Sequence, residues 1–225
     1  MNTLLNENNE GTKKETLYRR FWILSLMSGV EEVGCSPIDL KSFNILAYLA
    51  NAVAQCYGVP PLDATILKAC DGPLYPTLIW DIDRLVGMGL VRVSDIVVDV
   101  SKRLRNVSYA ITNAGLDCEE QCRMLHPSLA QTGDSLRSAA MAYSRNHLFL
   151  SKEGLLARDG NYADPTVSNG EVVDFGEWVR NNATANSIEK ILAELGLELR
   201  KDPAVGVNIY SRYLAAFAAN RVINE

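Results

Sequence analysis

The sequence predicts a mainly helical protein with a small β-ribbon, in the α+β class. Apolar residues recur every three to four positions over most of the 225 residues, which is the period of an amphipathic helix. Two stretches differ, VRVSDIVVDV and SYAIT, because both are β-branched and partly alternating. The composition, with 48% hydrophobic and 22% charged residues, is typical of a folded globular chain.

The N-terminal part predicts a polar tail followed by four helices. Residues 1–13 are Asn-rich and low in apolar content, so we expect a disordered tail there. Apolar periodicity predicts helices over 14–33 and 38–58, separated by the breaker GCSP. A short third helix is expected at 62–70. The fourth runs over 75–87 and ends in the glycines of GMG.

A strand–loop–strand pattern follows the fourth helix. Residues 91–100 and 108–112 predict two strands, which the polar segment SKRLRNV joins. Lys102, Arg103 and Arg105 gather at its tip, the place from which a ribbon contacts the phosphate backbone of double-stranded DNA. A solvated, charged hairpin tip accounts for the same three residues equally well.

The rest of the chain returns to a helical pattern. Helices are expected over 113–125 and 129–149, separated by a His-Pro pair. Residues 157–175 are rich in Gly, Asp, Asn and Pro, which predicts a long loop with one short strand at EVVDF. Two last helices are expected over 184–196 and 203–222, and the organisation changes near residue 126.

The two faces of the helix at 75–87 predict its role. With about 100° per residue, its apolar face holds Leu78, Ile79, Ile82, Leu85 and Val86. The opposite face holds Trp80, Asp83, Arg84 and Gly87, with Thr77 at its flank and Asp81 nearby. A helix that reads base edges needs Arg, Lys, Asn, Gln, Ser or Thr there, and aspartates would repel phosphates. We therefore expect Trp80, Arg84, Thr77 and Asp83 to contact a protein. The alternative is that Trp80 packs beneath other helices of this chain.

Residues 72–115 carry a resemblance to known proteins. GPLYPTLIWDIDRLVGMGLV, a strand, a basic tip and SYAITNAG resemble winged helix-turn-helix regulators of the PadR and MarR kind. The resemblance implies a winged-helix domain over 14–126, after the tail at 1–13. Residues 127–225 would then form a helical C-terminal extension.

The N-terminal half, with SPIDLKSFNILAYLANAV, PPLDATILK and the helix at 75–87, also resembles small middle components of bacterial defence systems of the Lamassu kind. That resemblance implies a non-catalytic adaptor in anti-phage or DNA-surveillance defence. Its partners would be an SMC-like or ABC ATPase subunit and an effector protein, and its wing would touch DNA. The alternative function is a PadR- or MarR-like transcriptional regulator that binds DNA as a homodimer.

Enzymatic and cofactor sites are not expected. No phosphate-binding loop, nucleophile elbow or zinc-protease motif occurs, and we expect neither a cofactor nor a metal. Cys118, Cys122 and His126 share a helical face at intervals of four residues. Buried structural cysteines explain them better than a metal site does. The net charge of −5 argues against a general nucleic-acid binder. Five cysteines and no apolar spanning segment predict a cytoplasmic protein without a membrane contact.

Overall fold

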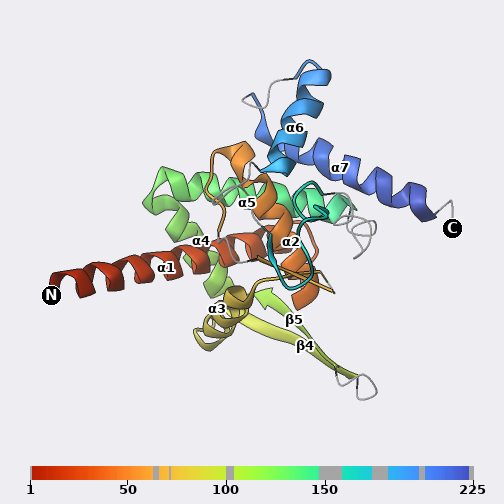
Figure 1. Cartoon of the computed structure of the whole chain (residues 1–225). Helices are drawn as coiled ribbons and strands as arrows, with labels where there is room; N and C mark the ends of the chain where they lie inside the picture. Colours follow the sequence, from red (N-terminus) through yellow and green to blue (C-terminus); the bar gives the residue numbers. More distant parts are fainter. Residues whose placement is uncertain are drawn as a thin grey trace.

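A computed structural model describes residues 2–62, 66–70, 72–99, 104–146, 159–173, 182–197 and 201–222 (Figure 1). The described helices are α1 (Asn2–Glu32), α2 (Leu40–Ala54), α3 (Pro76–Gly87), α4 (Asn113–Leu125), α5 (Pro127–Asn146), α6 (Ala183–Glu194) and α7 (Pro203–Val222), with a short 3₁₀ turn η1 (Gln55–Tyr57) after α2. The strands are β1 (Ile38–Asp39), β2 (Ile66–Ala69), β3 (Gly72–Leu74), β4 (Val91–Asp99), β5 (Leu104–Ile111) and β6 (Val172–Val173). The expected α+β class, mostly helical with little β-structure, is confirmed.

The first sheet contains the predicted ribbon and one strand that the sequence did not predict. Its order is β1-β5-β4 with antiparallel pairing, so β4 is an edge strand. The ribbon begins with Val91 opposite Ile111, and its register shifts between Val93 and Asp95, which is the position of a β-bulge. In Figure 1 the β4–β5 ribbon extends away from the helices.

The second sheet corrects the prediction of a helix at 62–70. Residues 66–69 form β2, which pairs antiparallel with β3 on one side and with β6 on the other. The apolar residues used to predict the helix, Ile66 among them, are also suited to a half-buried strand. The deciding partner, β6, comes from a segment about 100 positions later in the sequence, which no local pattern can reveal.

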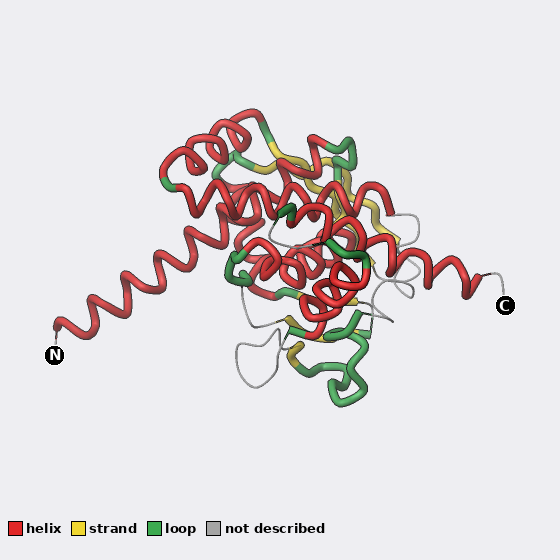
Figure 2. Tube along the Cα trace, turned by 90° about the horizontal axis from the view of Figure 1, so that it is seen from above, coloured by secondary structure: helices red, strands yellow, loops and turns green. Residues whose placement is uncertain are grey.

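The first helix is longer than the sequence predicts. It begins at Asn2 and thus includes the segment for which the sequence predicts a disordered tail. Extending an existing helix costs much less than starting one, so polar residues can continue the helix that the buried run 21–30 nucleates. The first turns of α1 and the last turns of α7 project from the body on opposite sides (Figures 1 and 2).

The second helix lies at the centre of the protein. Its N-cap is Asp39, whose Oδ1 accepts hydrogen bonds from the backbone N–H of Lys41 (3.0 Å) and Ser42 (3.1 Å). Every residue from Phe43 to Ala54 is buried, so other elements cover this helix on all sides.

One hydrophobic core runs through both halves of the chain. It contains Trp22 from α1, Leu46 from α2, Leu136 from α5 and Tyr210 from α7, each almost fully buried. A boundary near residue 126 falls between α4 and α5, and α5 packs against α1 and α2. Among the described residues, no helix combines the length and the apolar character that crossing a membrane requires.

Candidate protein-docking surface

The sequence of α3 explains how it is held. Pro76 occupies its first turn. Leu78, Ile82 and Leu85, on its apolar face, are exposed by 1% or less. Ile79 and Val86 are half-buried. The predicted apolar face is therefore confirmed, and α3 is anchored in the core along its whole length.

The outer face of α3 is open to solvent. Trp80 is 72% exposed and Met88, just after the helix, is 59% exposed. Asp83 and Arg84 are exposed as well, whereas Thr77 is half-buried. The alternative that Trp80 packs beneath other helices is wrong for the part of the chain that the structure describes.

Asp81 corrects the prediction for this face. It was expected near the outer face, but it is 4% exposed and points toward α1. Its carboxylate pairs with the guanidinium of Arg19 and accepts a hydrogen bond from Nε of Arg20 (2.9 Å). Three residues after Leu78, Asp81 lies only about 60° from that buried leucine around the helix. A helical wheel therefore places Asp81 near the buried face of α3, a position that the sequence analysis missed.

A hollow of about 560 Å³ opens beside the C-terminal half of α3. It is lined by Arg20, Asp83, Arg84, Gly87 and Met88. One wall comes from α1 and the other from α3, so the Asp81 ion pairs that join these two helices also fix the shape of the hollow.

The β4–β5 ribbon presents apolar side chains to solvent, next to the tip at which basic residues were predicted. Ile96, Val97 and Val98 are consecutive and 63%, 60% and 54% exposed, so apolar groups face solvent on both sides of the ribbon. Lys102 and Arg103 lie outside the described residues. The backbone of Arg105 pairs with Val98 in the ribbon, but its side chain is outside the description. The predicted DNA contact therefore stays a prediction.

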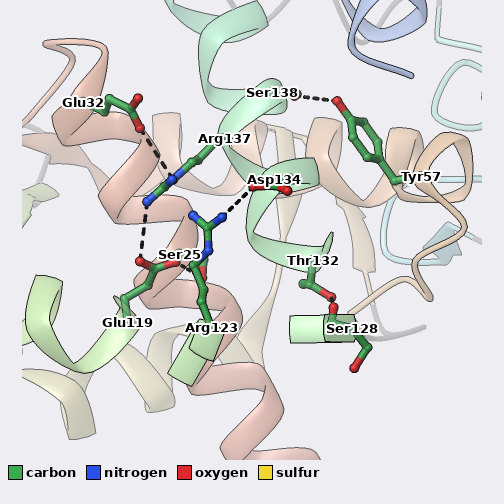
Figure 3. A network of polar contacts seen from close by, with 10 residues as sticks. All are labelled: Ser25, Glu32, Tyr57, Glu119, Arg123, Ser128, Thr132, Asp134, Arg137 and Ser138. Atoms are coloured by element: carbon green, nitrogen blue, oxygen red, sulfur yellow. Dashed lines mark hydrogen bonds and ion pairs between the residues drawn. The ribbon is translucent and has the colours of Figure 1, made fainter. Parts of the chain in front are cut away.

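A second hollow, of about 570 Å³, lies among α1, α4 and α5. Figure 3 shows the charged residues beside it. Glu119 is 1% exposed; it accepts a hydrogen bond from the hydroxyl of Ser25 (2.8 Å) and lies 3.7 Å from Nη2 of Arg137. Arg123 donates to Asp134 (2.6 Å). Nε of Arg137 also lies 3.5 Å from the carboxylate of Glu32, so opposite charges are paired across α1, α4 and α5. This arrangement holds α4 in place.

A buried carboxylate joins the two halves of the chain. Asp159, 1% exposed, accepts hydrogen bonds from the hydroxyls of Tyr48, Thr184 (2.7 Å) and Tyr210 (2.8 Å) and from the backbone N–H of Asn161 (3.1 Å) and Tyr162 (2.9 Å). We call Asp159 with these three hydroxyl residues the Asp159 cluster. It ties α2, α6 and α7 to one loop.

The Asp159 cluster has a structural role. Burial and the neighbouring carboxylate hold the pKa of Tyr48 well above its usual range, and they raise the pKa of Tyr210 in the same way. Both phenols therefore stay protonated as hydrogen-bond donors. The sequence places Asp159 in a Gly- and Asn-rich loop, where no periodicity marks it as buried.

The described residues contain no group of three or more His, Cys, Asp or Glu side chains able to hold a metal ion. His126 leaves the helical path at the end of α4, with φ −155° and ψ 139°. Its Nδ1 lies 2.8 Å from the hydroxyl of Ser128. Burial raises the pKa of the Cys122 thiol, which disfavours the thiolate that a metal would need.

Comparisons of this chain with protein-family models, with curated proteins and with solved structures gave no match.

Proposed function

We propose that this chain is a non-catalytic, winged-helix adaptor that docks a protein partner on the outer face of α3. The observation that carries the proposal is Trp80, a large aromatic side chain 72% exposed on a helix whose other face is locked in the core. Aromatic residues are preferred anchors of protein interfaces because they bury much area at little conformational cost. Met88, also exposed, extends the same apolar surface.

The order of elements supports the winged-helix part of the proposal. The elements from α1 to β5 follow the order α1, β1, α2, the hairpin β2–β3, α3, β4 and β5. Strand β1 pairs with β5 at the sheet edge opposite β4. A winged helix has its recognition helix directly before the ribbon, which is the position of α3. The hairpin β2–β3 is an addition between the second and third helices.

The surface chemistry favours a protein over base edges as the partner of α3. A groove-reading helix uses polar side chains that match base donors and acceptors. Here the outer face offers Trp80, Asp83, Arg84 and Gly87, and the ribbon adds the exposed run Ile96 to Val98. Exposed apolar side chains gathered on neighbouring elements are typical of protein interfaces.

The identity of the machine comes from the sequence resemblance of the N-terminal half to middle components of Lamassu-type defence systems. We therefore propose an SMC-like or ABC ATPase subunit and an effector as the partners, in the cytoplasm, with anti-phage defence as the context. An adaptor in such a complex needs a rigid body with one docking face and no catalytic residues of its own.

The direct experiment is co-expression of the full chain with the products of the neighbouring genes, followed by affinity purification and size-exclusion chromatography. We expect a stable complex that Trp80→Ser disrupts without lowering the melting temperature of the isolated chain. Leu195→Ser is the matched control, because Leu195 is 58% exposed at the end of α6. A complex that survives Trp80→Ser, or a chain that retains none of these proteins, would refute the proposal.

A transcriptional regulator is the second candidate, because the α3-and-ribbon arrangement equally suits a DNA-binding winged helix. Fluorescence anisotropy with a labelled DNA duplex at low salt separates the two. A regulator would bind tightly and lose affinity when Lys102, Arg103 and Arg105 are all replaced by alanine, with a flatter dependence on salt. The adaptor proposal expects weak binding without sequence preference.

A further inference from the structure

The hollow beside α3 differs in charge from the rest of the protein. Arg20 and Arg84 line it, against Asp83. Two cations and one anion leave a local positive charge, whereas the whole chain carries −5. Among the described residues, this places a small positive site next to the most exposed tryptophan.

The geometry leaves cationic groups available for a ligand. Arg20 uses its Nε on Asp81, so its two terminal nitrogens are not engaged by that contact, and the residue lines the hollow. Arg84 is exposed, and no side-chain contact of its guanidinium is found within the described ranges. A guanidinium presents paired N–H donors that match a carboxylate in a bidentate arrangement.

The end of α3 does not compete for these cations. The carbonyls of its last turn are occupied: Arg84 O accepts from Met88 N (3.0 Å), Leu85 O from Leu90 N (3.0 Å) and Val86 O from Gly89 N (3.0 Å). The floor of the hollow at Gly87 has no side chain, and nothing lies within 4 Å of where a Cβ would be. A side chain from outside can therefore reach between the two arginines.

The apolar groups beside the hollow define the rest of the ligand. Met88 lines it, and Trp80 lies on the same face of α3, one turn before Arg84. Phosphate groups of DNA could pair with the arginines but would gain nothing from Trp80 or Met88. An acidic peptide segment fits both the arginines and the apolar surface next to them, with a carboxylate for the first and an apolar side chain for the second.

We infer that the partner docked on α3 presents an acidic, apolar segment, which places an Asp or Glu side chain between Arg20 and Arg84 and an apolar side chain against Trp80 and Met88. This inference rests on the proposed function and specifies the chemistry of the partner. The local positive charge attracts the acidic segment. The apolar contact excludes water from the arginine–carboxylate ion pair and so strengthens that ion pair.

The test uses a random dodecapeptide library displayed on phage and panned against the full chain. Selected peptides are then synthesised with a fluorophore and titrated by anisotropy. We expect enrichment of Asp or Glu next to Leu, Ile, Phe or Trp. We also expect at least about a tenfold loss of affinity with Arg84→Glu, the range for losing one charged hydrogen bond. Arg212→Glu, the same charge reversal at an exposed position of α7, should leave affinity unchanged.

The outcomes separate this inference from the proposed function. Peptides that need Trp80 but are not acidic, or that bind the Arg84→Glu variant equally well, overturn the inference and leave the docking role of α3 intact. A library without an acidic binder overturns it too, as does duplex DNA that binds the wild type and loses affinity with Arg84→Glu. Loss of peptide binding on replacing every Asp and Glu of the peptide by Asn and Gln supports it. Failure of the complex to form with the neighbouring gene products instead refutes the proposed function itself.

Discussion

Replacing Asp159 by alanine is the most demanding test of how this fold is held together. The substitution removes an acceptor that is 1% exposed and that serves five donors, three hydroxyls and two backbone N–H groups. No solvent reaches these donors to replace the carboxylate. They would remain buried without partners, which is the costly case for hydrogen bonding.

The magnitude follows from the number of donors. At about 1 kcal/mol for each hydrogen bond lost, five donors correspond to a destabilisation of about 5 kcal/mol. Charge-assisted bonds are stronger, but removing the carboxylate also removes the cost of keeping it away from water, and these two effects act in opposite directions. A loss of about 4–6 kcal/mol is comparable with the total stability of many proteins, about 5–15 kcal/mol.

Asp159→Asn is the matched variant. Its amide keeps the shape and one oxygen. The hydroxyls of Thr184 and Tyr210 can rotate to accept from the new NH₂ group, since a hydroxyl both donates and accepts. We expect a loss of only about 1–2 kcal/mol, mainly the charge-assisted part of each bond. Urea unfolding followed by far-UV circular dichroism measures both variants. An alanine variant within about 1 kcal/mol of the wild type would refute a structural role for the cluster.

Three further predictions concern other parts of the fold. Asp81→Ala should cost about 2–3 kcal/mol, because it leaves its two arginine partners without their buried carboxylate, whereas Asp83→Ala should stay within about 0.5 kcal/mol; thermal melts of both variants compare them directly. Gly115→Ala should unfold the chain or cost about 3 kcal/mol or more, because a Cβ there would lie 2.7 Å from Ile111 Cγ1 and closer still to a backbone carbonyl. Gly87→Ala, with open space around it, should leave the midpoint of urea unfolding unchanged. The free energy of unfolding should fall as pH rises above 10, the ordinary pKa of tyrosine, because the unfolded chain then loses protons that the buried phenols retain. Urea midpoints between pH 8 and 11 should decline less steeply in Tyr48→Phe, and a decline unchanged by that substitution would contradict a raised pKa of Tyr48.

The elements predicted correctly are those whose signal is local. The fourth helix, the two ribbon strands and the helix at 113–125 each carry a periodic run bounded by glycine, proline or a capping residue. The structure has α3, β4 and α4 at these places, and β5 covers 104–111 rather than the predicted 108–112. Thr112 illustrates the cap, since its Oγ1 accepts from the backbone N–H of Gly115 (3.1 Å) at the start of α4.

The elements that were missed depend on partners far away in the chain. Whether 66–69 forms a helix or a strand is decided by β6, and β1 exists because Ile38 and Asp39 lie beside β5. The same reason hid Asp159, whose partners come from α2, α6 and α7. For the candidate docking surface, helical periodicity was enough to predict that Trp80 and Arg84 are exposed. The same periodicity, with the angle to Leu78 measured for every residue of the helix, predicts that Asp81 is buried.

The burial of α2 on all sides has a consequence for biosynthesis. A ribosome releases residues 40–54 long before it releases α5 and α6, which pack against them. During that interval a mainly apolar helix lacks much of its cover, and such surfaces favour aggregation and the binding of chaperones. Tyr48, in the middle of this helix, receives its acceptor only after 111 further residues have been added. Completion of the core therefore waits for the last helices to emerge, because Tyr210 of α7 belongs to it.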